Sequence, residues 1–158
     1  MWQHDPMEKK SDRASGIPVE RTISYRLSAL SNGFSLGNAR IYSKAHQLTL
    51  RDWRVLNLLW HHEPATSKAI GDIASYDKGQ MSRAVKKLEG RKLLDRVRQD
   101  NLKSPLLTLT PKGRTIVETI YPIARRREEE LLSVLNDSDR RTFDALLDRL
   151  LAKLGELD

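Results

Sequence analysis

Basic side chains gather in one stretch of the chain, residues 78–103, where their types and spacing suggest a binding chemistry. This stretch holds nine lysines and arginines against three carboxylates, a surplus of six within a formal net charge of +7 for the whole chain. Concentrated positive charge attracts a polyanion and orients its approach. The stretch is therefore the candidate binding site for a nucleic acid.

The first part of this stretch, about residues 78–90, is predicted to be a helix with one buried face. Asp77-x-x-Gln80 is a capping-box pattern at its start, and apolar residues follow at positions 81, 84, 85 and 88. Arginine can bind guanine bidentately, and serine or glutamine can reach base edges or phosphates. The residues predicted to contact DNA are Lys78, Gly79, Gln80, Ser82, Arg83, Lys86 and Lys87.

The neighbouring elements are those that place such a helix in a DNA groove. A helix that opens near Thr49 ends before Pro64, and Thr66 or Ser67 caps a short helix before residue 78. Two strands, 93–98 and 106–109, follow and are joined by a polar turn. The order is that of a winged helix-turn-helix, a mainly helical fold with a small β-hairpin, and Arg98 and Lys103 are its candidate wing contacts.

Two further segments carry more apolar surface than a small lobe can cover. Residues 19–44 are predicted to form one helix with two apolar strips, and Leu146, Leu150 and Leu154 belong to a strong stripe near the C-terminus. A third helix, from Pro111 onward, is expected to bend or break at Pro122. The excess of apolar surface favours pairing with a second copy of the chain.

Composition limits the other possibilities. The chain has 158 residues and no cysteine, which excludes disulfides, zinc thiolate sites and thiol-based redox sensing. It shows neither a membrane span nor an apolar leader, so we expect a cytoplasmic protein with no membrane partner. The expected domains are a flexible arm (1–16), a helical dimerisation region (17–46 and 111–158) and a DNA-binding lobe (47–110).

Several short motifs in this order resemble the MarR family of bacterial transcription regulators. They are Leu48-Thr49 followed by Trp53-Arg54-Val55-Leu56, then Ser82-Arg83, Leu88-Glu89, Leu93-Leu94 with Arg96, and Leu109-Thr110-x-x-Gly113. The resemblance covers roughly residues 20–155. It implies a homodimer with the helix of residues 78–90 in the major groove and the hairpin against the minor groove.

The chain departs from the family pattern at two places. Lys92 stands where the family usually has a glycine, and a side chain in a left-handed turn costs roughly 1 kcal/mol or more. The turn is therefore expected to have another shape or to use Gly90. At the wing the usual Asp-x-Arg becomes Asn101-x-Lys103, and lysine lacks the planar fork of arginine.

The resemblance also implies release from DNA by a small aromatic or phenolic compound. Serines on the helix of residues 19–44 lie between its apolar strips, where they could line a pocket for a planar aromatic acid. The candidate effector residues are Ser28, Ser31, Trp53 and Arg54. Close helix packing with satisfied hydroxyl groups is the alternative.

The remaining motifs point to no catalytic site, metal or cofactor. His61 and His62 are adjacent on a helix and point about 100° apart, so they are poor ligands for one metal ion and better explained as cations at a helix end. The chain lacks a glycine-rich phosphate loop and a nucleophile elbow, so we expect no enzyme. The sequence predicts a dimeric repressor that binds a pseudo-palindromic operator. The alternatives are a constitutive or architectural DNA-binding protein and, third, a protein adaptor.

Overall fold

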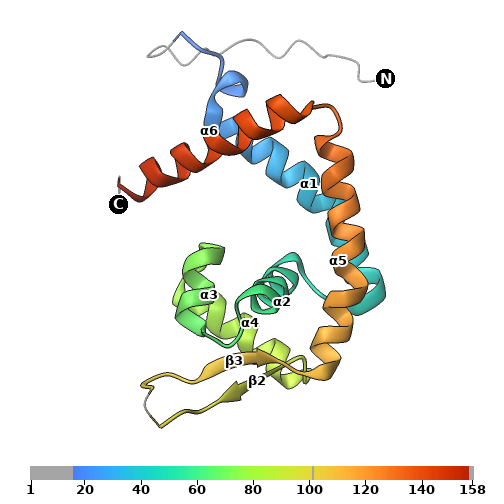
Figure 1. The fold of residues 1–158 in the computed structure, drawn as a ribbon, viewed down its shortest axis with the longest axis vertical. Coiled ribbons are helices and arrows are strands. Elements are labelled where there is room, and N and C mark those ends of the chain that lie inside the picture. The colour runs from blue at the N-terminus through green and yellow to red at the C-terminus, as the bar shows by residue number, and fades with distance from the viewer. Residues whose placement is uncertain (1–15, 101, 157–158) are drawn as a thin grey trace. The chain divides into compact units, whose positions relative to one another are not determined.

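The computed structural model describes residues 16–100 and 102–156, without the side chains of residues 38–45. The described part is mainly helical with one small antiparallel sheet (Figure 1), which confirms the predicted fold class. The chain divides into two compact units after Leu50, and each is described on its own. Within the described ranges, no helix combines the length and apolarity needed to cross a membrane. The predicted arm, 1–16, lies outside the described residues except for Gly16.

The first unit contains a short 3-10 turn, Val19–Arg21, and helix α1, Ile23–His46. The sequence predicts one helix from residue 19, but the extended backbone of Thr22 (φ −68°, ψ 148°) separates the two segments. The Thr22 hydroxyl accepts a 3.4 Å hydrogen bond from the Tyr25 amide, which is how an N-cap residue satisfies the first turn of a helix. Helix α1 therefore begins four residues later than predicted.

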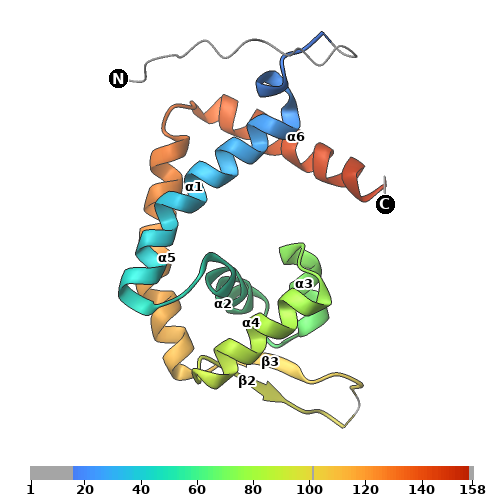
Figure 2. The same ribbon diagram turned by 180° about the vertical axis from the view of Figure 1, so that it is seen from behind.

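The second unit begins with three helices, α2 (Leu50–His62), α3 (Ser67–Ala74) and α4 (Lys78–Gly90). The same unit contains a three-stranded sheet of β1 (Ala65–Thr66), between α2 and α3, and β2 (Leu94–Val97) and β3 (Leu106–Leu109), after α4. The spatial order of the strands is β1-β3-β2. Figure 2 shows the β2–β3 hairpin extending beyond the helices as a wing. The sequence predicts this hairpin but misses β1, because two residues are too few for an alternating pattern.

Local hydrogen bonds explain where the helices of this lobe begin. The Asp77 carboxylate accepts a 2.7 Å bond from the Gln80 amide, and the Gln80 side chain accepts a 3.3 Å bond from the Asp77 amide. This confirms the predicted capping box. Thr66 caps α3 by accepting a bond from the Ala69 amide. The apolar side chains at 81, 84, 85 and 88 are buried beneath α4, as their spacing predicts.

The turn after α4 differs from both expected alternatives. Lys92 itself adopts the left-handed conformation, with φ 58°, and Gly90 remains the last helical residue. The Leu93 amide donates to the Leu88 carbonyl at 3.0 Å, and the Lys92 amide donates to the Glu89 carbonyl at 2.8 Å. These two bonds form a Schellman motif and satisfy the terminal carbonyls of α4. The hydrogen bonding of the helix end thus keeps a lysine in a conformation that favours glycine.

The segment after β3 packs directly against this turn. Thr110 caps helix α5 (Pro111–Leu132), and its hydroxyl also donates a 2.8 Å bond to the Lys92 carbonyl. A β-carbon on Gly113 would lie 2.0 Å from the Leu93 carbonyl oxygen, far inside van der Waals contact. Only glycine therefore allows the first turn of α5 to lie so close to the end of α4, which explains the Leu-Thr-x-x-Gly motif.

Helix α5 continues through Pro122 without a break, and α6 (Asp137–Gly155) follows it. Of the predicted bend or break at Pro122, the break is therefore wrong. A proline inside a helix removes one amide donor, but the turns on either side keep their own backbone hydrogen bonds. Helix α5 accordingly extends ten residues beyond Pro122. Arg140 of α6 contacts Glu129 of α5 at 2.8 Å and links the two helices.

Candidate nucleic-acid interface

The outer face of α4 carries most of the polar residues that the sequence assigns to DNA contact. Residues 78, 79, 82, 83 and 86 are exposed, whereas the opposite face is buried in the lobe core. The preceding helix α3 packs against α4, and the turn between them contains Ser75 with φ 55°. This arrangement presents one continuous face of α4 to an external partner.

Arg83 and Gly79 are matched to each other on this face. A β-carbon on Gly79 would lie 3.4 Å from an Nη atom of Arg83 and 3.2 Å from Asp77 Oδ1. The absence of a side chain at Gly79 therefore leaves room for the Arg83 guanidinium beside the first turn of α4. A guanidinium at that position offers its fork to a base edge or a phosphate.

Two predicted contact residues have partners inside the lobe. The side-chain oxygen of Gln80, Oε1, accepts the Asp77 amide in the capping box. The Lys87 ammonium lies 2.5 Å from Asp52 Oδ2 on α2, and Asp52 is only 2% exposed. Lys87 therefore compensates a buried carboxylate, and we leave it out of the proposed interface. Sequence reasoning missed this pair because its members are 35 residues apart.

The wing carries Arg98 and Lys103 on its exposed surface, while Asn101 lies outside the described residues. The strand β2 is tied to α4 through Arg96, whose Nε donates to both carboxylate oxygens of Glu89 at 3.0 and 3.1 Å. Arg96 is part of the motifs that resemble the MarR family, but the sequence did not indicate a function for its side chain. Its side chain fixes the base of the wing against the helix.

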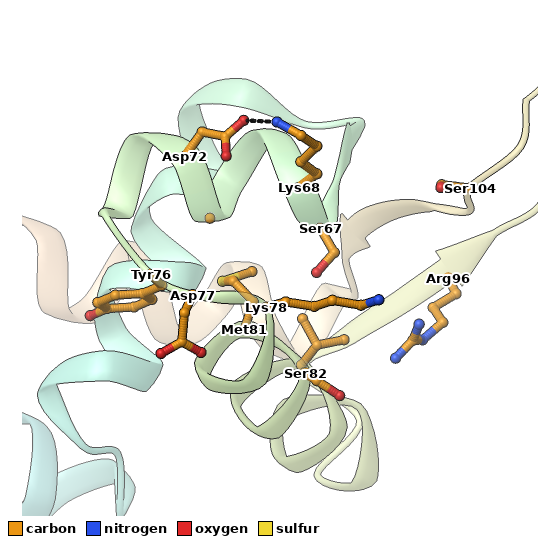
Figure 3. A pocket seen from close by; sticks show the side chains of 12 residues that line it. Ser67, Lys68, Asp72, Tyr76, Asp77, Lys78, Met81, Ser82, Arg96 and Ser104 are labelled. Carbon is orange, nitrogen blue, oxygen red and sulfur yellow. Dashed lines mark hydrogen bonds and ion pairs between the residues drawn. The ribbon is translucent and has the colours of Figure 1, made fainter. Parts of the chain in front are cut away.

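A hollow of about 670 Å³ lies between α3, α4 and the base of the wing. Figure 3 shows polar side chains reaching into it from all three elements. Apolar atoms of Met81 and Val85 form part of its wall. The remaining lining residues are Ser67, Lys68, Gly71, Asp72, Tyr76, Asp77, Lys78, Ser82, Arg96 and Ser104. This hollow could not be predicted from the sequence, because it depends on the packing of three separate elements.

The four predicted effector residues are divided between the two units. Ser28 and Ser31 are exposed on α1, whereas Trp53 is buried in α2 and Arg54 is exposed. The Trp53 ring belongs to the lobe core at 5% exposure. The proposed effector pocket therefore stays a prediction.

The segment at the end of α2 contacts α5 and β3. The His61 ring lies 5.5 Å from the Tyr121 ring of α5. One carboxylate oxygen of Glu63 contacts Arg114 at 2.6 Å, and the other accepts a 2.6 Å bond from the Leu109 amide. Among the described residues no cluster of three metal-ligating side chains occurs. Glu63 thus joins the end of α2 to β3 and α5.

Comparisons with known proteins agree with this geometry. A family model described as MarR family matches residues 46–101, which span α2, α3, α4 and β2. The organic hydroperoxide resistance transcriptional regulator of Bacillus subtilis (strain 168) is 27% identical over 133 residues, which cover 79% of this chain and 88% of that protein. Because these relatives are transcription regulators, the expectation that the chain is not an enzyme is confirmed.

Solved structures share the fold over most of the chain. A MarR/EmrR family regulator from Acinetobacter sp. ADP1 is 26% identical with a TM-score of 0.82, covering 89% of this chain and 99% of that one. The MepR–DNA complex of S. aureus has a TM-score of 0.79 at 22% identity, covering 86% of this chain and 99% of that one. The chain is therefore similar to the MarR family of winged helix-turn-helix transcription regulators, by a family model over its DNA-binding lobe and by fold over most of its length.

Proposed function

We propose that the protein is a homodimeric repressor that binds a pseudo-palindromic operator and is released by a small aromatic acid. The observation that carries this proposal is the exposed polar face of α4, held between α3 and the wing. In this proposal the α4 residues 78, 79, 82, 83 and 86 and the capping Gln80 contact the major groove. Arg98 and Lys103 contact the minor groove or its phosphates.

Exposed apolar side chains on the long helices support the homodimer. Leu27 and Leu30 of α1 are 42% and 47% exposed, and Leu150 and Leu154 of α6 are 53% and 57% exposed. Apolar residues that repeat at helical spacing and remain exposed in a single chain favour burial against a second copy. The proposed division therefore keeps 17–46 and 111–158 as the dimerisation region and 47–110 as the lobe. Light scattering that shows a stable monomer of 18.1 kDa at micromolar concentration would refute the dimer.

The proposed effector is a planar aromatic acid, and its candidate binding residues are Ser28, Ser31, Trp53 and Arg54. MepR, one of the proteins of similar fold, regulates a multidrug efflux pump of Staphylococcus aureus, and the relative from Bacillus subtilis is named for hydroperoxide resistance. The present chain has no cysteine, so a thiol cannot be its sensor. A ligand can release DNA only by binding the competent and incompetent states with different affinity.

Selection of bound duplexes from a random DNA pool, followed by a calorimetric screen of aromatic acids, tests the proposal. Arg83→Ala is expected to cost roughly 1–3 kcal/mol and to relax base preference, whereas Lys103→Ala weakens all sequences alike and lowers the salt slope by about one unit. Ser28→Leu is the matched effector variant and should abolish ligand binding while it leaves operator affinity intact. If no acid binds, or if one binds equally well with and without operator, the constitutive DNA-binding alternative is correct.

A further inference from the structure

The hollow beside α4 has a cationic end. Figure 3 shows the Lys78 side chain of α4 and the Arg96 side chain of β2 extending toward this end from opposite sides, while the Asp77 carboxylate turns away. Asp77 accepts the Gln80 amide, and Asp72 holds Lys68 in a 2.6 Å ion pair, so both lining carboxylates have partners on their own helices. The hydroxyl groups of Ser67 and Ser82 also line the hollow.

The two cations of this end are incompletely neutralised by the protein. Within the described part of the chain, Lys78 has no ion pair, and Glu89 contacts only the Nε atom of Arg96. The terminal nitrogens of Arg96 therefore remain available as donors. Two positively charged side chains that face the same space, with hydroxyl donors beside them, are suited to bind an anion with several oxygen atoms.

We propose that this end of the hollow is a phosphate site, which holds one backbone phosphate of the bound DNA between Lys78 and Arg96. The proposal rests on the DNA-binding function proposed above and adds Arg96, Ser67 and a shared ligand to it. Phosphate contacts fix the register and orientation of a protein on the duplex. One phosphate held by both α4 and β2 would set the angle between the recognition helix and the wing.

Shared occupancy predicts how the variants combine. Loss of one neutralised phosphate lowers the salt slope by about 0.9 and weakens binding about fivefold at 0.15 M salt. We expect the phosphate to leave the site when either cation is lost, so Arg96→Gln and Lys78→Gln should each have this effect on a fluorescent duplex of random sequence. Because both residues bind the same phosphate, the double variant should also lose about fivefold, and not the roughly 25-fold of two independent phosphates.

Two matched variants separate this role from a structural one. If Arg96 only tied the wing to α4, Glu89→Gln would weaken DNA binding as much as Arg96→Gln, since both remove the same ion pair. The phosphate site predicts instead that Glu89→Gln binds the duplex at least as well as the wild type. Arg126→Gln, on the exposed surface of α5, changes the net charge equally and should leave affinity unchanged.

The binding assay uses the full chain, and circular dichroism confirms that each variant is folded. Additive losses in the double variant, or wild-type affinity and salt slope in Arg96→Gln, would overturn the proposal while DNA binding itself stands. Pyrophosphate, added at constant ionic strength, should displace the duplex no better than chloride does. Preferential displacement from the wild type but not from Arg96→Gln would assign the site to a free phosphate compound and overturn the backbone assignment. Absence of any duplex binding by the wild type would instead refute the proposed function.

Discussion

The buried ion pair beneath the recognition helix allows a stability prediction with a definite asymmetry. Asp52 of α2 is 2% exposed, whereas the Lys87 side chain of α4 is 43% exposed. Removal of the lysine leaves a carboxylate that cannot reach water without opening the lobe. Removal of the acid leaves an ammonium that can turn outward and be hydrated. The two single substitutions should therefore have unequal costs.

The magnitude follows from that difference in access to water. Lys87→Met keeps the aliphatic stem but removes the ammonium that pairs with the buried Asp52 carboxylate, which costs about 3–5 kcal/mol. Asp52→Asn keeps the shape of the side chain and exchanges an ion pair for a neutral polar group, so we expect about 1–2 kcal/mol. The double variant buries no uncompensated charge and should be more stable than Lys87→Met alone.

Urea unfolding followed by circular dichroism at one fixed protein concentration measures all three values, since the stability of a dimer depends on concentration. Equal costs for the two single variants would refute the asymmetry. If Lys87→Met has wild-type stability but loses affinity for all DNA sequences with a salt slope lower by about one unit, Lys87 contacts phosphate and not Asp52.

Three further outcomes are expected. Lys92→Gly should raise the free energy of unfolding by about 1 kcal/mol, because glycine adopts a φ of 58° without the penalty of a side chain; a lower urea midpoint would show that the lysine side chain itself stabilises the turn. Gly113→Ala should cost at least about 1–3 kcal/mol in thermal unfolding, since its β-carbon would overlap the Leu93 carbonyl, and a wild-type melting temperature would contradict this packing. The hydrogen bond and charge of Arg140 lower the pKa of Glu129 below its ordinary 4.5. The stabilisation from that pair is thus present above pH 4.5 and lost as the pH falls through the lowered pKa. An acid titration of Arg140→Gln should lack this component, and an unchanged profile would exclude the pair as its source.

Elements with a local chemical signal could be predicted from the sequence. Asp77 and Gln80 are three residues apart and bond to each other, so their spacing alone places the start of α4. Thr110 and Pro111 place the start of α5 in the same way. The start of α1 was misplaced because Pro18 and the apolar repeat both fit an earlier helix, and only the hydroxyl of Thr22 shows the true cap.

Contacts between distant segments could not be predicted. The pairing of Asp52 with Lys87 and of Glu89 with Arg96 depends on how α2, α4 and β2 pack, and helical periodicity contains no information about such partners. The conformation of Lys92 could not be predicted either. The sequence indicates a strained turn, but it does not show that hydrogen bonds around the turn hold Lys92 in the left-handed conformation. The recognition face was predictable because exposure on α4 follows from its own apolar spacing.

The fixation of α5 at its base makes this helix a lever arm. Gly113 packs against the turn that follows α4, and Arg114 pairs with Glu63 at the end of α2, so two contacts hold the first turn of α5 against the lobe. At 1.5 Å per residue, the 22 residues of α5 span about 33 Å. A rotation of about 10° around one end then displaces the other by about 6 Å, a sizeable fraction of the roughly 34 Å between successive turns of a DNA groove. If α5 turns as one unit, a small rotation about its distal end would therefore displace α4 by a distance that matters for its register with a groove.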